Sequence, residues 1–239
     1  LRCRLVVAAD GRNSAMRQAA GIDVTTHRFG QKALAFAVTH TVPHDNISTE
    51  VHRTGGPFTL VPLPDRDGLP CSAIVWMEEG PKAEALAALP DAAFETEMTT
   101  RSCGLYGALR LASRRTIWPI ISQHAKALSG ERLALVAEAA HVVPPIGAQG
   151  LNMSLRDLTT LVDLARKTPQ DLGSTDMLAR YDRARMADVR MRVAGITALN
   201  QASMASNRTL RDLRALGLNT LYGVPQVRTS LMRLGLGAG

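Results

Sequence analysis

One stretch of the sequence constrains the fold more than any other, because a strand signal, a rigid loop and a long helix signal follow one another without interruption. Residues 133–137 form a short apolar run that is typical of a strand. From residue 149 to residue 166, apolar side chains recur at helical spacing on one face, at Leu151, Leu155, Leu158, Leu161 and Ala165. A strand that leads through a loop into a helix predicts an α/β domain.

The loop between this strand and this helix carries the most specific chemistry. It reads Glu-Ala-Ala-His-Val-Val-Pro-Pro-Ile-Gly-Ala-Gln-Gly-Leu-Asn over residues 138–152. Pro144 and Pro145 predict a rigid turn, and Gly147 and Gly150 let a ligand approach the backbone closely. Free N–H groups and the positive end of the helix dipole collect at the same place. Such a site favours a flat ligand that gains negative charge.

A second strand, turn and helix opens the chain. Residues 5–8 are apolar, Ala-Asp-Gly-Arg-Asn-Ser follows at residues 9–14, and a helical pattern runs to Ala20, with Gly21 as its stop signal. Because Asp-Gly is common in turns, this motif alone is weak support for a ligand site.

The residues between the two units read mostly as antiparallel sheet. Apolar runs at residues 34–41, 58–62 and 72–77 are separated by Pro, Gly and Asp, a helix is predicted over 91–102, and another strand over 116–122. We therefore expect four parts: part of an α/β domain at residues 1–28, a β-rich domain at 29–124, a return to the α/β domain at 125–168, and helices at 169–239.

The net charge of +7 is concentrated at the C-terminal end. Residues 177–239 hold ten Arg and three Asp, and the rest of the chain is balanced. Arg183, Arg185, Arg190 and Arg192 are interleaved with apolar positions at helical spacing, namely Met186, Val189, Val193, Ile196 and Leu199. These arginines form either a solvated helix face or a surface attracted to anionic lipid headgroups or an acidic partner.

Composition excludes several other classes. Aromatic residues make up 4% of the chain and no nucleic-acid module is present, so nucleic-acid binding is not expected. Cys3, Cys71 and Cys103 lack paired metal-ligand spacing, which indicates reduced thiols and no metal site. The sequence has no apolar run of about 18 residues and no signal-peptide pattern at its start. We therefore expect a cytoplasmic protein that associates at most peripherally with the inner face of a membrane.

The two motifs together, with a β-rich insertion between them, resemble flavoprotein aromatic hydroxylases of the para-hydroxybenzoate hydroxylase fold, and most of all the ubiquinone-biosynthesis hydroxylase family. Family members carry an Asp-Gly motif like that at residues 10–14, and a Gly-Asp-Ala-Ala-His motif followed by proline and Gly-Gln-Gly-Leu-Asn. Tyr181 and Arg185 match a Tyr-x-x-x-Arg element, and residues 213–239 also have the family pattern.

The resemblance implies an FAD-binding domain of the three-layer ββα, Rossmann-like type, with an inserted antiparallel substrate domain and a C-terminal helical tail. It implies a monooxygenase that hydroxylates an aromatic ring of the polyprenyl phenol type, with NAD(P)H as electron donor and a flavin hydroperoxide as oxidant. It assigns cofactor binding to Asp10, Gly11, Arg12, Ser14, Glu138, Ala139, His141, Pro145, Gly147, Gln149, Gly150, Leu151 and Asn152. The residues at 147–152 would lie against the isoalloxazine, and Asp10, Gly11 and Arg12 near the pyrophosphate and ribityl chain. The sheet from residue 29 to 77, with Trp118, would cover the substrate. The resemblance assigns no catalytic residue, and it gives His141 a structural place beside the flavin.

The sequence departs from the family pattern at two points. Ala137-Glu138 stands where the motif has Gly-Asp, and the Gly-x-Gly-x-x-Gly motif that binds the ADP half of FAD is absent from these residues. The chain is expected either to be part of a longer enzyme or to be a non-catalytic relative that binds a lipid substrate or helps assembly. A different flavoprotein of the same fold, such as a phenol hydroxylase or a halogenase, is a further alternative.

Overall fold

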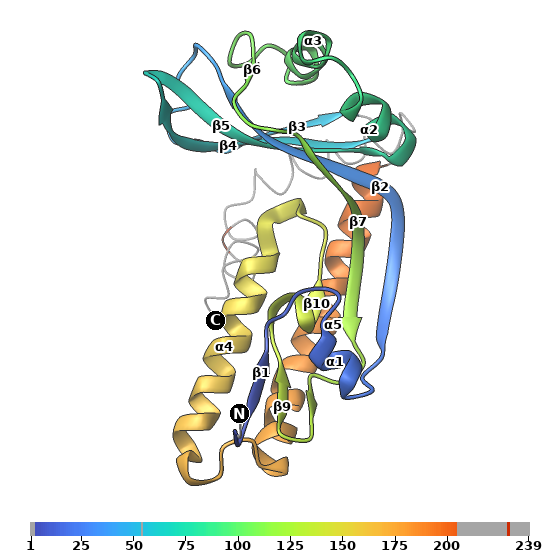
Figure 1. Cartoon of the computed structure of the whole chain (residues 1–239), viewed down its shortest axis with the longest axis vertical. Coiled ribbons are helices and arrows are strands. Elements are labelled where there is room, and N and C mark those ends of the chain that lie inside the picture. Colours follow the sequence, from blue (N-terminus) through green and yellow to red (C-terminus); the bar gives the residue numbers. More distant parts are fainter. Residues whose placement is uncertain (1–2, 54, 205–228, 230–239) are drawn as a thin grey trace. The chain divides into compact units, whose positions relative to one another are not determined.

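The computed structural model describes residues 3–53, 55–204 and 229, and these divide into two compact units (Figure 1). Of the described residues, the first unit contains 3–28 and 121–200, and the second contains 29–53, 55–120 and 201–204. Strands β2 (Val24–Thr39) and β7 (Thr116–Ala125) contribute residues to both.

The first unit is built on a small sheet whose strands come from distant parts of the chain. Its elements are β1 (Val6–Ala8), α1 (Ala15–Ala19), β8 (Ser129–Gly130), β9 (Leu133–Leu135), β10 (His141–Val142), α4 (Gln149–Lys167) and α5 (Thr175–Met204), with short 3-10 turns at Ala137–Ala139, Ile146–Ala148 and Pro169–Asp171. The sheet has the order β1-β9-β8, with β1 parallel and β8 antiparallel to β9, while β10 pairs with β7. A parallel strand pair that leads into helices confirms the predicted α/β class.

Helix α4 begins where the sequence predicts but buries only the C-terminal part of the predicted apolar face. It packs Met153, Asp157 and Leu161 inward; of the predicted positions, Leu161 is buried and Ala165 half-buried, whereas the other three are exposed. The exposed positions are Leu151 (69% exposed), Leu155 (51%) and Leu158 (44%). The reason is that the 3.6-residue period fits two apolar stripes on this helix, and the one that contains Met153 and Leu161 packs into the core of the first unit.

Helix α5 buries four of its five predicted apolar positions, while Leu199 is exposed. The predictions for residues 205–239, including the family-like stretch 213–239, lie outside the described residues. Among the helices that the structure describes, none combines the length and the apolar character needed to cross a bilayer.

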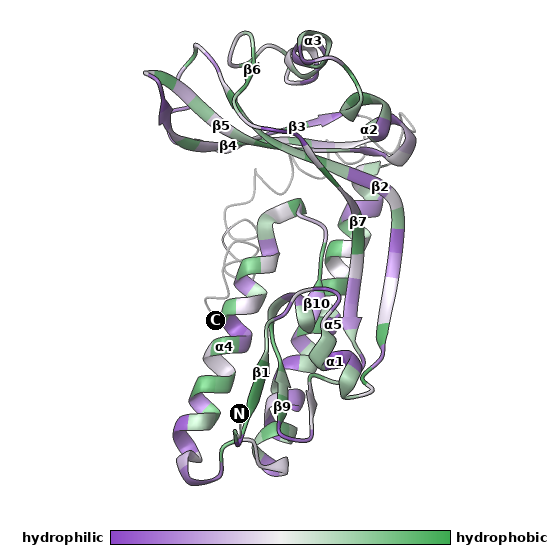
Figure 2. Cartoon of the chain, in the orientation of Figure 1, coloured by the Kyte–Doolittle hydropathy of each residue, from purple (hydrophilic) through white to green (hydrophobic). Residues whose placement is uncertain are grey.

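The second unit is an antiparallel sheet with helices on one face (Figure 1). Its other elements are β3 (Thr49–Arg53), β4 (Gly56–Arg66), β5 (Leu69–Glu79), β6 (Arg110–Leu111), α2 (Gly80–Ala87) and α3 (Asp91–Arg101). The strands follow the order β2-β5-β4-β3, and Trp76 of β5 lies opposite Leu34 of β2 and Phe58 of β4. Phe94 of α3 packs edge-on against Phe36 and completes this core. The hydropathy of these strands alternates along the chain (Figure 2), as expected for a sheet covered on one face. This confirms the predicted mostly antiparallel region, although β3, β6 and α2 were not predicted.

Candidate cofactor site

The β1–α1 turn holds the first predicted motif in a tight, hydrogen-bonded form. Gly11 has a φ of 86°, which favours glycine. The Ser14 hydroxyl accepts a hydrogen bond from the Arg17 N–H at 3.0 Å and so caps α1, and the Asp10 carboxylate accepts one from the Met16 N–H at 3.2 Å. A hydrogen bond from Ser14 lowers the pKa of Asp10. Asp10 is therefore an ionised, exposed turn residue at neutral pH.

The structure brings the first motif next to the start of the second. The Arg12 Nε lies 3.6 Å from the Glu138 Oε2. Arg17, which is buried, donates from Nη1 to the Ala139 carbonyl at 2.8 Å and from Nη2 to the Arg12 carbonyl at 2.9 Å. A buried guanidinium with two fixed acceptors sets the spacing between the two segments. Two motifs 122 residues apart in sequence thus form one polar edge.

The loop before α4 leaves the helix N-terminus open. Gly147 and Ala148 both have left-handed backbone, with φ of 72° and 50°, and no side chain caps α4. A Cβ at Gly147 would meet nothing within 4 Å, and one at Gly150 would meet only Val143 at 3.9 Å. Within residues 3–53 and 55–204, no side chain therefore fills the space next to these two glycines at the start of the 19-residue helix more closely than 3.9 Å.

The remaining predicted residues surround this opening. Pro145 is exposed, has helical backbone angles and caps the N-terminus of the 3-10 turn Ile146–Ala148. Leu151 is exposed in the first turn of α4, next to Asn152, which is half-buried. Gln149 donates to the Gly147 carbonyl at 3.1 Å. This edge fits a flat ring that accumulates negative charge, since a helix N-terminus stabilises an anion and the two glycines leave room for the ring.

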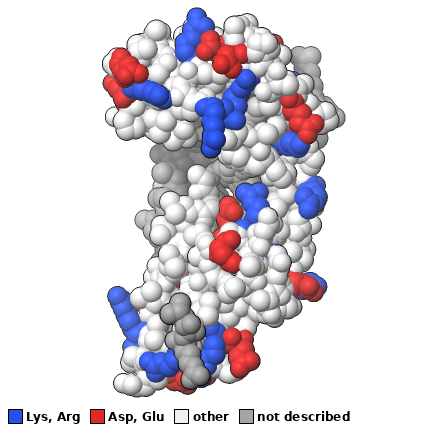
Figure 3. Space-filling model, viewed as in Figure 1, with Lys and Arg blue, Asp and Glu red and all other residues white. Residues whose placement is uncertain are grey.

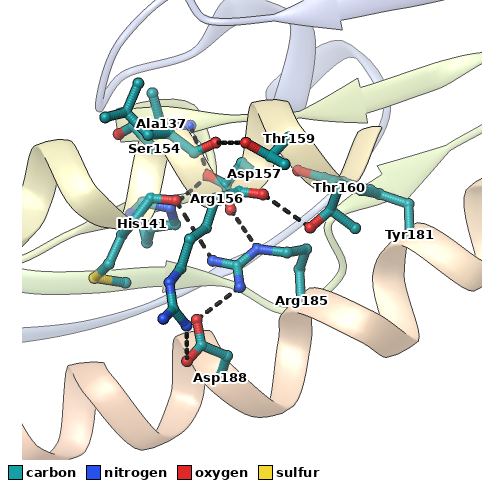
Figure 4. Close-up of polar contacts among 12 residues, drawn as sticks. Ala137, His141, Ser154, Arg156, Asp157, Thr159, Thr160, Tyr181, Arg185 and Asp188 are labelled. Carbon is teal, nitrogen blue, oxygen red and sulfur yellow. Dashed lines mark hydrogen bonds and ion pairs between the residues drawn. The ribbon is translucent and has the colours of Figure 1, made fainter. Parts of the chain in front are cut away.

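A buried carboxylate lies behind this surface (Figure 4). Asp157 is fully buried and accepts three hydrogen bonds: from the Ala137 N–H at 3.1 Å, from His141 Nε2 at 2.7 Å and from Arg185 Nε at 2.8 Å. Ala137, with a φ of 54°, occupies the position of the glycine in the family motif. The bond to Asp157 holds this uncommon backbone in place. His141 is thus a buried structural donor to Asp157.

A second carboxylate extends the network toward the start of α4. Asp188 accepts hydrogen bonds from Arg185 Nη1 at 2.6 Å and from Arg192 Nε at 2.9 Å, and lies 3.5 Å from Arg156 Nη1. Arg192 then donates to the Gln149 side-chain oxygen at 3.1 Å. Burial acts to raise the pKa of Asp188, but the hydrogen bonds from Arg185 and Arg192 outweigh it and lower the pKa.

The network corrects the prediction for the C-terminal arginines. Arg185 and Arg192 do not belong to a solvated face, because their side chains are 4% and 11% exposed. Arg183 and Arg190 are exposed as expected. On the face drawn in Figure 3, the Lys and Arg side chains are interspersed with Asp and Glu.

Sequence reasoning did not single out Arg17, Asp157 or Asp188. One signal was present for Asp157: it lies four residues after Met153 and four before Leu161, so a carboxylate shares the face of two apolar residues. No local pattern marks the contact of Arg17 with Ala139, which is 122 residues away. A signal was present for Asp188, because Arg185 lies three residues before it and Arg192 four residues after it on a predicted helix.

Together, the parallel strand pair, the Asp-Gly turn and the open N-terminus of α4 define a nucleotide-cofactor domain of the α/β class. The family model described as "FAD binding domain" matches residues 1–196. The chain belongs to this FAD-binding domain family, in agreement with the resemblance drawn from its motifs.

Two curated relatives have similar sequences. Ubiquinone hydroxylase UbiL from Rhodospirillum rubrum is 32% identical over 99% of this chain and 55% of the relative. The 3-demethoxyubiquinol 3-hydroxylase from Escherichia coli is 27% identical over 99% of this chain and 60% of the relative. The chain thus spans little more than half the length of these proteins.

Among solved structures, the Diels-Alderase PyrE3 matches with a TM-score of 0.75 over 98% of this chain and 50% of that protein. The identity is 20%, so this likeness concerns the fold.

Proposed function

We propose that this chain is the larger, C-terminal part of an FAD-dependent monooxygenase that hydroxylates an aromatic ring of the polyprenyl phenol type in ubiquinone biosynthesis. The observation that carries the proposal is the open start of α4, where Gly147 and Gly150 leave the helix N-terminus accessible beside a polar edge formed by Arg12 and Glu138. The names of the two curated relatives support the reaction and the pathway.

Within this proposal, each part of the edge has a role. FAD supplies the oxidising chemistry when it is bound. The N–H groups at residues 149–151 stabilise negative charge on the ring, Glu138 holds the polyol chain, and Arg12 orients Glu138 or binds phosphate. Asp10, Gly11 and Ser14 keep the turn in the shape that places Arg12 toward Glu138. His141, Ala139 and Pro145 shape the loop.

The exposed stripe of α4 supports a longer polypeptide. Leu151, Leu155, Leu158 and Val162 form an apolar surface, and in the described residues β1 has a strand neighbour on one side only. An apolar helix face beside an open strand edge fits a βαβ nucleotide-binding unit that would also hold the ADP half of FAD. We propose that this unit covers both.

The substrate side of the proposal rests on the second unit. The face of its sheet opposite the helices carries small apolar residues in register, Ala35 opposite Val75 and Ala37 opposite Ala73, all half-buried. This face suits an apolar ring with a prenyl chain better than a charged substrate.

NAD(P)H as electron donor and weak association with anionic membrane surfaces complete the proposal. Exposed arginines such as Arg183 and Arg190 would each contribute about 1 kcal/mol near such a surface. Binding to anionic vesicles that persists unchanged at high salt, or in the Arg183→Gln/Arg190→Gln variant, would contradict this part.

The test joins the chain to an N-terminal βαβ unit and measures turnover. We expect a yellow protein that consumes NADH or NADPH and dioxygen in the presence of a prenylated phenol and releases a hydroxylated ring, detected by mass spectrometry. A flavin-loaded protein that gives no hydroxylated product with any prenylated phenol would favour the non-catalytic alternative.

A further inference from the structure

The two segments proposed to contact the cofactor meet the same charged cluster in the protein interior. The first, residues 137–139, is held by Asp157 through the Ala137 N–H. The second, residues 147–152, is held by Arg192 through the Gln149 side chain. Asp157 and Arg192 are in turn joined by Arg185 and Asp188.

Asp188 occupies the centre of this connection. It lies on α5 and, among the residues that the structure describes, pairs with three arginine side chains: Arg156, Arg185 and Arg192. It therefore touches neither segment. Each oxygen of its carboxylate takes a different role, since Oδ2 accepts from Arg185 and Oδ1 accepts from Arg192.

We propose that Asp188 is a positioning residue that couples the two segments, so that the backbone around Ala137 and the first turn of α4 are held in one relative geometry. This inference rests on the proposed function for its relevance to FAD, although the coupling itself concerns only this chain's own residues.

The physical reason is that two cations share one partly buried carboxylate. Removing its charge leaves Arg185 and Arg192 with weaker, neutral hydrogen bonds in a site of low dielectric. Arg192 then loses the ion pair that orients its side chain toward Gln149. Arg185 loses one of the two carboxylates that hold its guanidinium group in the orientation that contacts Asp157. Both segments are expected to open more often, since the left-handed Ala137 depends on Asp157.

Hydrogen exchange with mass spectrometry on the 239-residue chain tests the coupling without any flavin. We compare the Asp188→Asn variant with Asp176→Asn, a matched change on the same helix at an exposed aspartate paired with Arg180. In Asp188→Asn, exchange in the peptides covering 137–142 and 147–153 is expected to rise at least threefold, while peptides of β4 and β5 stay unchanged. Asp176→Asn is expected to change neither segment.

A rise in one segment alone, in neither, or equally in Asp176→Asn overturns the proposal. If Asp188→Asn unfolds the first unit, the Arg192→Gln variant is measured in its place, because Arg192 contacts Gln149 directly and is connected to Ala137 through Asp188, Arg185 and Asp157. Exchange that rises around 147–153 but not around 137–142 in this variant also overturns the coupling.

An FAD titration of the same variants in the chain extended by a βαβ unit separates this inference from the proposed function. Coupling predicts at least fivefold weaker FAD binding for Asp188→Asn and a shifted flavin absorption band, with Asp188→Glu recovering part of both. If the unsubstituted extended protein does not bind FAD, the proposed function is contradicted. If the unsubstituted protein and the Asp188→Asn variant bind FAD with equal affinity, the role of Asp188 is contradicted.

Discussion

Replacing Arg185 by methionine removes the cation that joins the fully buried carboxylate of Asp157 to the partly buried carboxylate of Asp188. The Arg185 guanidinium bonds Asp157 at 2.8 Å and Asp188 at 2.6 Å, and its side chain is 4% exposed. Hydrogen bonds between charged groups contribute about 1.5–3 kcal/mol each, so the two bonds of Arg185 contribute at most about 3–6 kcal/mol to the free energy of unfolding. Breaking a buried pair by removing one partner costs about 3–5 kcal/mol. We expect Arg185→Met to lower the free energy of unfolding by about 4 kcal/mol.

The two units can be followed separately in one urea titration. The 19 residues of α4 and all but the last four of the 30 residues of α5 belong to the first unit, whereas α2 and α3 contribute 8 and 11 residues to the second. Circular dichroism at 222 nm therefore follows mainly the first unit. Both tryptophans, Trp76 and Trp118, lie in the second unit, so their fluorescence follows that unit.

With a urea slope of about 2 kcal/mol per molar, the expected loss moves the circular dichroism midpoint down by about 2 M. The tryptophan midpoint should stay in place. The control Arg183→Met changes an exposed arginine on the same helix and is expected to stay within about 0.5 kcal/mol. Adding Asp157→Asn to Arg185→Met should cost less than the sum of the two single changes. A loss below about 1 kcal/mol for Arg185→Met would refute the view that this network holds the first unit together.

Three further changes test other parts of the structure. Tyr181→Phe removes the hydrogen bond from the tyrosine hydroxyl to the Leu135 carbonyl (2.7 Å) and should lower the free energy of unfolding by about 1–2 kcal/mol in the same titration. Because burial raises the pKa of Tyr181, the parent should also lose stability as pH rises above about 10, and the variant should not. The lowered pKa of Asp188 contributes stability above about pH 4 that is lost as pH falls through the folded-state pKa. In acid titrations the free energy of unfolding of the parent should therefore fall more steeply below about pH 4 than that of Asp188→Asn, and the two should converge; parallel curves would contradict this role of the carboxylate. Phe94→Ala empties a fully buried site between the sheet and α3 and should lower the tryptophan-detected stability by about 3–5 kcal/mol; a loss under 1 kcal/mol would contradict the packing around Trp76.

The parts of the fold that follow from local pattern were predictable. The strand at 133–135, the helix that begins at Gln149 and the helix at 91–101 are each indicated by apolar spacing, proline and glycine within a dozen residues. The strands of the second unit were longer than predicted, since cross-strand pairing extends them into polar residues at their ends.

The interior of the candidate site was not predictable, because its contacts connect distant residues. Arg17 meets Ala139 across 122 positions, and Arg185 meets Asp157 across 28. A single sequence shows an arginine on an amphipathic helix as a charge, and only the packing of α4 against α5 shows that Arg185 and Arg192 turn inward. The exposed stripe of α4 has the same origin, since periodicity indicates that a face is apolar but not what covers it.

The most direct test of the central claim is the FAD dissociation constant of the extended chain with and without a side chain at Gly150. Among the residues that the structure describes, a Cβ there comes within 4 Å of Val143 alone, at 3.9 Å, so Gly150→Val should fold and place its methyl groups in the space proposed for the flavin ring. Gly195→Val is the matched control, because Gly195 is an exposed glycine on α5 whose Cβ would meet nothing within 4 Å. The account predicts near-stoichiometric FAD in the parent and the control, and at least tenfold weaker binding in Gly150→Val. Equal FAD affinity in all three proteins would contradict it.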